Sequence, residues 1–598
     1  MKKTIALLAL AGLLAAPLTL LGGCNTIQTE GGDLKDIKGR PLTIASFVDL
    51  SLDKPGQNGN VNLFYEAKQK YEKENNAAIT FKLYNEQIFQ NKLIQMVGSG
   101  NAPDLVYCGT LHMPRFAAMQ LLQPIDEFMD PAAVNYPDTA ASIMWGGKHY
   151  AARVEQIQPY VIWYNKKIFQ KNGITEPYTL WKEGKWNWEK FREVGMALTQ
   201  DTDKNGETDL WGFDTSGIYT PMWANAGKWF KVDDNKNVTI TWKEPAFYNG
   251  LKFMQTAVQT DKWWCPDPIA GYNQFATGNF AMIGEPFEFI QKYAKNMDTS
   301  LIACAPWPQG PNFQENGGKY YTACNIIGIA NGAKNPYGAA AYCSLITELE
   351  KGLDRIPLGN AEAEKYLSEQ DWEVLDHVRN NALIDSLGWG EWDGSKWFYP
   401  IVTENQDIST VLDSLESVLK NEINKTMSYK LPEIEAFKEP EPLTFENGDM
   451  GYMTTDGCAG SASITTASGE TLAGKSSLKL KLGGTEKAAL RTDPGKLKIP
   501  GYHSYKVSFD YKFLKVDEAC KEYGLDLFVT MRPLASVDSD AYQTGYIALS
   551  GVDGDTGTAT GEINLNTGEA DICLTFVNGI TGGGEIAIDN LQITEIPT

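Results

Sequence analysis

The chain has 598 residues, which is long enough for several domains of about 150 residues each. Its formal net charge is −22, and its composition of 43% hydrophobic and 21% charged residues is ordinary for globular protein. This charge argues against a nucleic acid partner, because polyanions bind basic surfaces, and it suits a protein that meets neutral ligands or metal cations.

The first 24 residues predict a signal for export. A basic start (MKK) precedes a long apolar run, and the run ends in LGGC, which resembles a bacterial lipobox. Such a signal is cut before its cysteine, here Cys24, which then receives lipid. The alternative is a retained membrane-spanning helix, which the proline and the glycine pair disfavour. We expect residues 25–40 to form a polar tether and the protein to be lipid-anchored on the extracellular face of the cell membrane.

Residues 41–432 predict an α/β domain. Short apolar strands alternate with amphipathic helices at its start, and the expected elements are strand 41–50, helix 62–75, strand 77–85, helix 87–100 and strand 102–109. This alternation implies parallel strands joined by crossover helices. Helical segments such as WNWEKFREVGMALTQ then dominate to about residue 430.

A proline-rich stretch, residues 433–442, predicts an extended linker, because proline blocks helix formation. Helical periodicity disappears beyond it. Runs such as SYKVSFDYKFL and LDLFVTMR alternate apolar and polar residues, and clusters of Gly, Asp, Ser and Thr separate them. Many short strands with such turns predict an all-β sandwich or jelly roll over residues 443–598.

GETLAGKS, residues 469–476, matches the phosphate-binding P-loop pattern G-x-x-x-x-G-K-[ST] at every specified position. A P-loop needs a helix after it, because the helix N-terminus points at the phosphates. Here SLKLKL follows, and its alternation of leucine and lysine indicates a strand. We therefore interpret this segment as a turn between two strands of the sandwich and predict that the chain binds no nucleotide.

Signatures of catalysis are missing from the sequence. It contains no HExxH and no GxSxG, and its nine cysteines include no CxxC pair. Paired carboxylates for glycoside hydrolysis leave no linear motif, so that activity stays open on this ground alone.

Five stretches of the α/β domain carry a resemblance to a known family. They are SGNAPDLV at 99–106, YAARVEQIQPYVIWYNKKIFQKNGI at 150–174, WNWEKFREVGMALT at 186–199, FATGNFAMIGEPFEF at 275–289, and APWPQGP followed by GIANGAKNPYGAAAYCSLITE. Their order and spacing resemble the bacterial extracellular solute-binding lipoproteins of family 1, the sugar ABC importer type. The resemblance implies two α/β lobes with a hinge, in the fold of the periplasmic binding proteins, which close on a ligand.

The resemblance also implies a function. A cell-surface binding protein of this type captures a sugar or oligosaccharide and delivers it to the membrane subunits of an ABC importer, with no catalysis and no required cofactor. The alternative is a surface glycan-adhesion protein, in which the C-terminal sandwich binds polysaccharide.

A sugar offers hydroxyl groups at its edge and C–H groups on its faces, so its site needs polar groups and aromatic platforms. At positions where the family places platforms, this chain has Trp223, Phe287 and Trp307. The polar candidates are Asp49, Thr110, Gln156 and Glu285. The family commonly has tryptophan where this sequence has phenylalanine at 287. For each residue the alternative is core packing or a solvated loop, and core packing is the interpretation of the adjacent Trp263 and Trp264.

DTDKNGETDLWGFD resembles the first part of an EF-hand calcium loop. Side chains that offer oxygen fall at loop positions 1, 3, 5, 7 and 9, namely Asp201, Asp203, Asn205, Glu207 and Asp209. Gly206 occupies position 6, but position 12, ordinarily a glutamate, is Gly212, and Asp214 is a candidate for the missing ligand. We expect a structural calcium site here, with a polar turn as the alternative.

The sandwich resembles jelly-roll carbohydrate-binding modules that hold a structural calcium. The matching stretches are FENGD at 445–449, SSLKLKL at 476–482, YKVSFDYKF at 505–513 and AIDNLQI at 587–593. The resemblance implies that Glu446 and Asp589 share the ion, with Asp449 as a further candidate; the alternative is ordinary strand-end turns. The candidates for exposed aromatic side chains that would stack on a glycan are Tyr502, Tyr505 and Tyr542.

Overall fold

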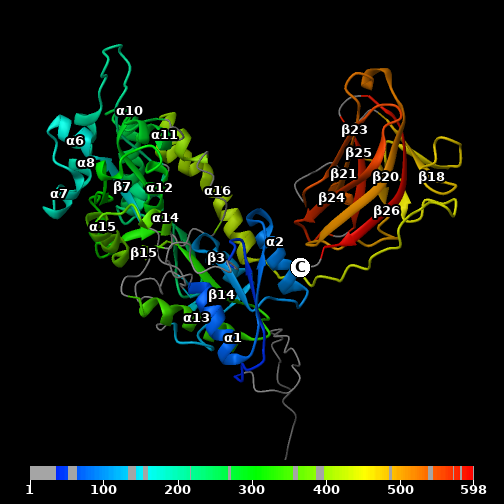
Figure 1. Ribbon diagram of the computed structural model, residues 1–598, viewed down its shortest axis with the longest axis horizontal. Helices are drawn as coiled ribbons and strands as arrows, with labels where there is room; N and C mark the ends of the chain where they lie inside the picture. The colour runs from blue at the N-terminus through cyan, green and yellow to red at the C-terminus, as the bar shows by residue number, and fades with distance from the viewer. Residues whose placement is uncertain are drawn as a thin grey trace, which may run out of the picture.

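The computed structural model describes residues 35–50, 63–131, 143–152, 159–215, 217–266, 271–322, 324–353, 358, 361–385, 389, 396–483, 488–536, 543–569, 571–579 and 582–596. Figure 1 shows two α/β lobes, one above the other, and a β-sandwich beside them. The predicted fold class, a two-lobed α/β body followed by an all-β sandwich, is confirmed. In the part of the chain that is described, no helix combines the length and the apolar character that crossing a bilayer requires.

Lobe I contains a five-stranded sheet whose first three strands are parallel, as the β-α-β-α-β pattern predicted. In sheet order the strands are β2 (Ile79–Leu83), β1 (Leu42–Ser46), β3 (Leu105–Gly109), β14 (Asn325–Ala330) and β4 (Leu122–Gln123). Helices α1 (Leu63–Asn75) and α13 (Pro336–Lys351) pack together on one face, and α2 (Glu86–Gly98) and α3 (Arg115–Ala118) contribute to the core on the other. Helices cover both faces of the sheet, and the central strand β3, LVYCG, is buried along its whole length.

Lobe II contains a four-stranded sheet in the order β12 (Ile302–Pro306), β7 (Tyr160–Asn165), β11 (Phe280–Pro286) and β8 (Trp211–Thr215). Strand β7 is antiparallel to β11 and β12, whereas β8 is parallel to β11. Its helices are α6 (Lys166–Asn172), α7 (Pro177–Lys182), α8 (Trp188–Leu198), α9 (Thr220–Trp223), α10 (Pro245–Gln259), α11 (Gly271–Thr277), α12 (Ile290–Tyr293), α14 (Ala361–Glu364) and α15 (Glu369–Asn380).

Short two-stranded ladders complete the lobes. They are β5 (Met144–Trp145) with β6 (Lys148–His149), β9 (Phe230–Val232) with β10 (Val238–Ile240), and β13 (Tyr320–Thr322) with β15 (Ala382–Ile384). The long helix α16 (Ile408–Met427) then connects the lobes. In lobe II, Lys243 lies 2.5 Å from Asp413 and 2.6 Å from Glu416 of this helix, and at lobe I the helix contacts α3.

Helix α8 illustrates how the sequence builds lobe II. Asn187 caps its N-terminus by accepting a hydrogen bond from the Lys190 N–H at 3.0 Å, and its apolar residues, spaced three and four apart, are buried. Gly195 lies on the buried face because Trp263 occupies the adjoining space. A Cβ atom at Gly195 would come within 2.2 Å of the Trp263 ring. Trp263 and Trp264 are both buried, so the interpretation of this pair as core is confirmed.

Replacement of Gly195 by alanine is expected to lower the free energy of unfolding by about 1–3 kcal/mol, because the added methyl group must displace a ring packed within the core. Urea denaturation followed by circular dichroism measures this change. Met196→Ala, at an exposed position of the same helix, is the matched control. Equal stability of the two variants would show that the core accommodates the methyl group.

The sandwich is formed by two antiparallel sheets. One has the order β16 (Met453–Thr454), β19 (Ala488–Thr492), β25 (Ile572–Asn578), β21 (Leu525–Pro533) and β23 (Ile547–Gly551). The other has the order β17 (Ser461–Thr465), β18 (Ser477–Leu482), β26 (Gly584–Glu595), β20 (Ser504–Val516), β24 (Thr556–Leu565) and β22 (Gln543–Thr544). Alternate residues of β20 and β21 are buried between the sheets, as the two-residue period predicted.

The GETLAGKS segment is a turn, as predicted from the strand-like sequence after it. It lies between β17 and β18, and Gly469 and Gly474 adopt positive φ angles of 88° and 66°. The backbone N–H groups of Lys475 and Ser476 donate to the Glu446 carboxylate at 2.7 and 3.1 Å. Amides that would hold a phosphate in a P-loop therefore hold a carboxylate here.

Candidate functional site

One edge of the lobe II sheet gathers the ends of all four strands. Residue pairing places Tyr160 beside Pro286, Val161 beside Pro306, and Gly284 beside Thr215. The start of β7 and the carboxyl ends of β8, β11 and β12 therefore lie together. Ligands of open α/β sheets commonly bind beyond strand carboxyl ends.

Aromatic side chains meet at this edge. Trp223 of α9 and Trp307, just after β12, line one small pocket together with Tyr160 and Tyr320. The pocket has a volume of about 10 Å³, so the rings largely fill it, and Trp223 and Trp307 are 5% and 3% exposed. We call the four residues Tyr160, Trp223, Trp307 and Tyr320 the aromatic cluster. The structure thus brings two of the predicted platforms together.

Two polar features accompany the aromatic cluster. Asp385, which is 1% exposed, accepts a hydrogen bond from Trp223 Nε1 at 2.9 Å. The indole N–H of Trp307 is buried, and no described residue accepts its hydrogen bond. Burial of a donor without a partner is costly, which marks this N–H as a place where a ligand oxygen would be stabilised.

Tyr321 lies on the other side of the β13 strand from Tyr320. Burial raises the pKa of Tyr321 to about 12, and the nearby Asp385 carboxylate contributes to the increase. The Lys228 ammonium lies 5.0 Å from the centroid of its ring. A second pocket of about 120 Å³ adjoins Tyr321 and is lined by Lys228 and Asn316 among others.

The other described ligand candidates, Asp49, Thr110, Glu285 and Phe287, do not line this pocket. Asp49 is exposed after β1, and Thr110 is buried after β3, where its Oγ1 accepts a hydrogen bond from the Cys324 N–H at 3.1 Å. Glu285 is buried in β11, and Phe287 is fully buried in the core. Gln156 lies outside the described residues. None of these side chains is among the described residues that line the pocket of the aromatic cluster.

Sequence reasoning missed Tyr160, Tyr320 and Asp385. Tyr160 begins the first strand of lobe II, and Asp385 directly follows β15, so both stand at strand ends where ligands bind. A search for polar and aromatic residues at every strand end would have found both, and also Tyr320, which begins β13. The pairing of β13 with β15, about sixty residues later in the chain, has no such signal.

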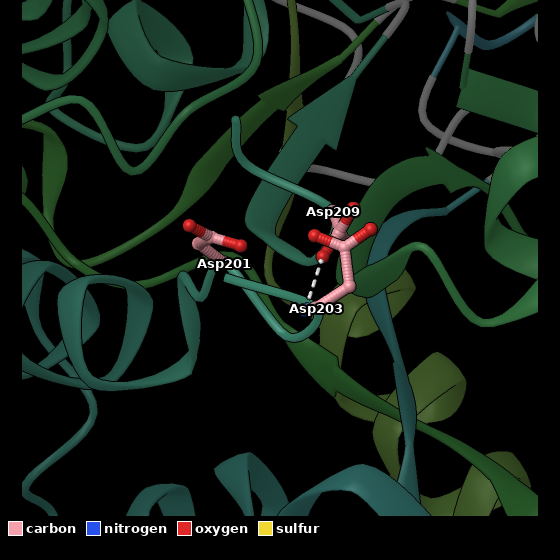
Figure 2. A group of neighbouring side chains, drawn as sticks. All are labelled: Asp201, Asp203 and Asp209. Atoms are coloured by element: carbon pink, nitrogen blue, oxygen red, sulfur yellow. Dashed lines mark hydrogen bonds between the residues drawn. The ribbon is translucent and has the colours of Figure 1, made fainter. Parts of the chain in front are cut away.

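The predicted calcium loop brings three carboxylates together. Oxygen atoms of Asp201, Asp203 and Asp209 lie within 4.8 Å of one another, and Figure 2 shows Asp203 and Asp209 side by side with Asp201 across from them. The Asp201 carboxylate accepts the Gly206 N–H at 2.8 Å. Hydrogen bonds from Thr202 lower the pKa of Asp209.

The other oxygen donors of the predicted calcium loop are placed differently. The Oδ1 of Asn205 accepts the Glu207 N–H at 2.7 Å, and the Glu207 side chain is exposed. Asp214 is fully buried in β8 and does not belong to the group of three carboxylates. Three clustered carboxylates offer the oxygen ligands that Ca²⁺ prefers.

The two predicted metal ligands of the sandwich approach the same turn. Asp589 is buried in β26, and its carboxylate accepts hydrogen bonds from Ser477 Oγ at 2.8 Å and from the Ala473 N–H at 3.3 Å. Burial raises the pKa of Asp589, and the Glu446 carboxylate also contributes to raising it, which shows that the two acids are near each other. Asp449 is exposed and accepts the Gly451 N–H at 2.8 Å.

Two of the three predicted glycan-stacking tyrosines of the sandwich, Tyr502 and Tyr505, lie in the described part of the chain. Tyr505 is fully buried in the core and donates its hydroxyl to the Pro500 carbonyl at 2.6 Å, so its prediction as an exposed aromatic is wrong. Its place in the alternating strand puts it on the inner face. Tyr502 is half-buried against the core of the α/β lobes. Tyr542 lies outside the described residues, as does Cys24, the expected lipidation site.

Comparison with known proteins extends this description. Residues 59–347 match the family model described as bacterial extracellular solute-binding protein. Binding proteins of Brucella abortus (strain 2308) and Brucella suis biovar 1 (strain 1330) are each 26% identical over 29% of this chain. The match covers 46% of the length of these relatives, which is about half.

Solved structures with similar chains include an ABC substrate-binding protein of Listeria monocytogenes in complex with cycloalternan. It is 18% identical, with a TM-score of 0.43, and the match covers 65% of this chain and 99% of that one. The galacto-N-biose-/lacto-N-biose I-binding protein of Bifidobacterium longum is 15% identical, with a TM-score of 0.49 over 64% and 97% of the two chains. In sequence, residues 59–347 of this chain are similar to the bacterial extracellular solute-binding proteins.

Proposed function

We propose that this chain is a cell-surface substrate-binding protein that captures a sugar or oligosaccharide and delivers it to an ABC importer. The observation that carries the proposal is the aromatic cluster at the edge of the lobe II sheet, together with the Asp385 carboxylate and the Trp307 N–H, which has no acceptor among the described residues. Aromatic rings suit the C–H faces of a sugar, and a carboxylate and an N–H suit its hydroxyl groups. The family match over residues 59–347 supports the binding role.

Binding requires the aromatic cluster to separate. A volume of about 10 Å³ is far below the few hundred Å³ that small-molecule pockets usually have. In proteins of two lobes, hinge motion opens and closes such a site. We propose that Trp223 and Trp307 provide the stacking surfaces once the cluster opens, and that the chain performs no chemistry on the ligand.

Calorimetry with a panel of mono- and oligosaccharides on the full chain tests this function. We expect at least one sugar to bind and to be recovered unchanged by chromatography. Recovery of a hydrolysed product would instead support a glycoside hydrolase. If deletion of residues 443–598 abolishes binding while the remaining chain stays folded, the sandwich and not the aromatic cluster holds the ligand, which is the adhesion alternative.

The export signal adds a location to this proposal. We propose that Cys24 is lipidated and anchors the protein to the extracellular face of the cell membrane. Mass spectrometry of the N-terminal peptide tests it, since a diacylglyceryl group on Cys24 adds a defined mass that Cys24→Ala removes.

We also propose structural calcium at two places, the group of Asp201, Asp203 and Asp209 and the pair of Glu446 and Asp589. Saturating calcium is expected to raise the free energy of unfolding by about 1–3 kcal/mol, because an ion that binds only the folded chain stabilises it. Asp203→Asn should remove the part of this gain that comes from the loop.

Asp233→Asn is the matched control for the calcium measurement. Asp233 is likewise exposed and accepts backbone N–H groups within a turn, but it lies outside the three-carboxylate group. Asp589→Asn tests the sandwich pair in the same titration. A calcium response that is equal in the wild type and in Asp203→Asn would reject the loop as a calcium site.

A further inference from the structure

The segment between the α/β lobes and the sandwich contacts both bodies at a few residues. The Ile434 N–H donates to the Gly98 carbonyl at the end of α2 at 3.3 Å. A Cβ atom at Gly98 would lie 2.6 Å from the Pro432 carbonyl oxygen, so glycine is what allows this approach. Phe437, only three residues later, is buried in the sandwich core beside Tyr505. The predicted linker therefore contacts both bodies within a few residues.

His503 of the sandwich makes polar contacts with the same segment. It is 4% exposed, and its two ring nitrogens lie 2.6 Å from Glu595 Oε1 and 3.1 Å from the Glu435 carbonyl oxygen. The Glu595 N–H in turn donates to Glu439 Oε1 at 2.9 Å, and Lys498 pairs with the Glu435 carboxylate at 2.5 Å. These contacts hold residues 435–439 against the sandwich surface.

Helix α2 makes direct contact with the sandwich, and Figure 1 shows it as a lobe I helix on the side facing the sandwich. Asn91 Nδ2 donates to Asn566 Oδ1 at 2.8 Å. Lys92 of the same helix is 7% exposed. Burial lowers its pKa to about 8, and the charges of Glu595 and Glu562 in the sandwich oppose that shift. We call Asn91, Lys92 and Asn566 the α2 contact.

Tyr502 adds an apolar anchor next to the α2 contact. Its side chain comes from the sandwich but packs against the core of the α/β lobes. Tyr429, which follows α16, packs against the same core, and burial together with the nearby Tyr502 raises its pKa. The backbone of Tyr502 has a φ of 59°, a left-handed conformation that is costly for a bulky residue. Such strain persists where surrounding contacts hold it.

Charges of opposite sign face each other around the same boundary. A groove of about 800 Å³ has basic side chains from lobe I, Arg40, Lys82 and Lys334, and acidic side chains Glu439 and Glu595 from the linker and the sandwich. Facing charges of this kind fix the orientation of two surfaces more than they add affinity. Burial of the Tyr502 side chain supplies the attraction between the sandwich and lobe I, and the facing charges select their relative orientation.

From these contacts we infer that the sandwich is docked on lobe I through the α2 contact and Tyr502, and moves with lobe I as one rigid unit. Hinge closure then swings lobe II against a lobe I–sandwich unit, and any ligand on the sandwich keeps a fixed orientation to the lobes. A flexible tether would instead let the sandwich sample many orientations. The inference concerns the arrangement of the bodies and does not depend on the nature of the ligand.

Small-angle X-ray scattering of the full chain and its variants tests this docking. The wild type is expected to scatter as one compact particle. Lys92→Glu buries an acid at the boundary with the sandwich, where the charges of Glu562 and Glu595 would repel it, so we expect the sandwich to detach and the radius of gyration to rise by roughly a tenth. Adding Glu562→Lys to Lys92→Glu should recover part of the docking, because it restores an opposite charge.

Lys73→Glu is the matched control, since it makes the same charge change on the exposed side of α1 in lobe I. Tyr502→Ser examines the boundary from the sandwich side and covers the case in which Lys92→Glu fails to fold, and it too should increase the radius of gyration. The inference is overturned if the wild type scatters as an ensemble with a detached sandwich. It is also overturned if Lys92→Glu and Tyr502→Ser both scatter like the wild type, or if Glu562→Lys recovers nothing.

Discussion

Trp223→Ala is expected to weaken sugar binding by about 2–3 kcal/mol, which corresponds to roughly a 30- to 150-fold increase in Kd. The indole lies in the aromatic cluster, 6.4 Å from the Tyr160 ring between centroids, and donates its N–H to Asp385. Its loss removes a stacking surface and also leaves a buried carboxylate without that donor. Calorimetry on the full chain, with the sugar that binds the wild type, measures the change.

Trp211→Ala is the matched control for this substitution. Trp211 is a half-buried tryptophan of the same lobe at the start of β8, at the opposite end of that strand from the edge where the aromatic cluster lies, and it does not line the pocket. This variant should have a Kd within about twofold of the wild-type value, because a substitution far from the ligand has little effect on its binding. Thermal melts of both variants establish that each is folded. An unchanged Kd for a folded Trp223→Ala would remove Trp223 from the binding site.

Asp371→Ala is expected to lower the free energy of unfolding by about 3 kcal/mol. Asp371 is 2% exposed, and its carboxylate accepts the Cys304 N–H of β12 at 3.0 Å and the Ser368 N–H at the start of α15 at 2.9 Å. Alanine leaves both donors unsatisfied inside the protein. The carboxylate thus joins α15 to the lobe II sheet.

Asp371→Ala is also expected to weaken ligand binding. Helix α15 leads into β15, and Val378 and Ala382 from this stretch line the pocket that holds the aromatic cluster. A loosened α15 displaces Asp385, so affinity should fall in parallel with stability. Urea denaturation gives the first quantity and calorimetry the second.

Ser368→Ala separates the contribution of the helix cap from that of the hydrogen bond between Asp371 and Cys304. It removes a side chain that accepts the Asp371 N–H at 3.2 Å, yet it keeps the link from Asp371 to Cys304. An N-cap loss of this kind costs about 1 kcal/mol, and the ligand affinity should stay close to that of the wild type. If Asp371→Ala were no more destabilising than Ser368→Ala, the link to β12 would contribute nothing.

Local patterns predicted the secondary structure well because period and turn residues act over short distances. The alternation in residues 504–514 and 525–532 predicted two strands with one inner face, and the observed strands, Ser504–Val516 and Leu525–Pro533, both have it. The GETLAGKS turn was recognised by the strand-like SLKLKL after it. The linker was predicted only as extended, since its contacts with α2 and with the sandwich depend on residues far away in the chain.

The binding site was predicted in part. Trp223 and Trp307 meet in one pocket, whereas Phe287 is buried in the core and Thr110 holds Cys324. A resemblance identifies positions that tend to face a ligand, but it does not state which way a side chain turns. The β13–β15 ladder brings Tyr320 and Asp385 to the site. It joins segments about sixty residues apart, and no local pattern marks such a pairing.

By itself, the sequence determined that this protein has an α/β body, a proline-rich connection and an all-β sandwich, because hydrophobic period, proline and glycine act on neighbouring residues. Only the tertiary structure decided which residues share a site and how the bodies are joined. Trp223 meets Asp385 across 162 residues of chain and Asn91 meets Asn566 across 475, and such contacts follow from the packing of whole lobes. Their energy depends on burial, which no single stretch of sequence fixes.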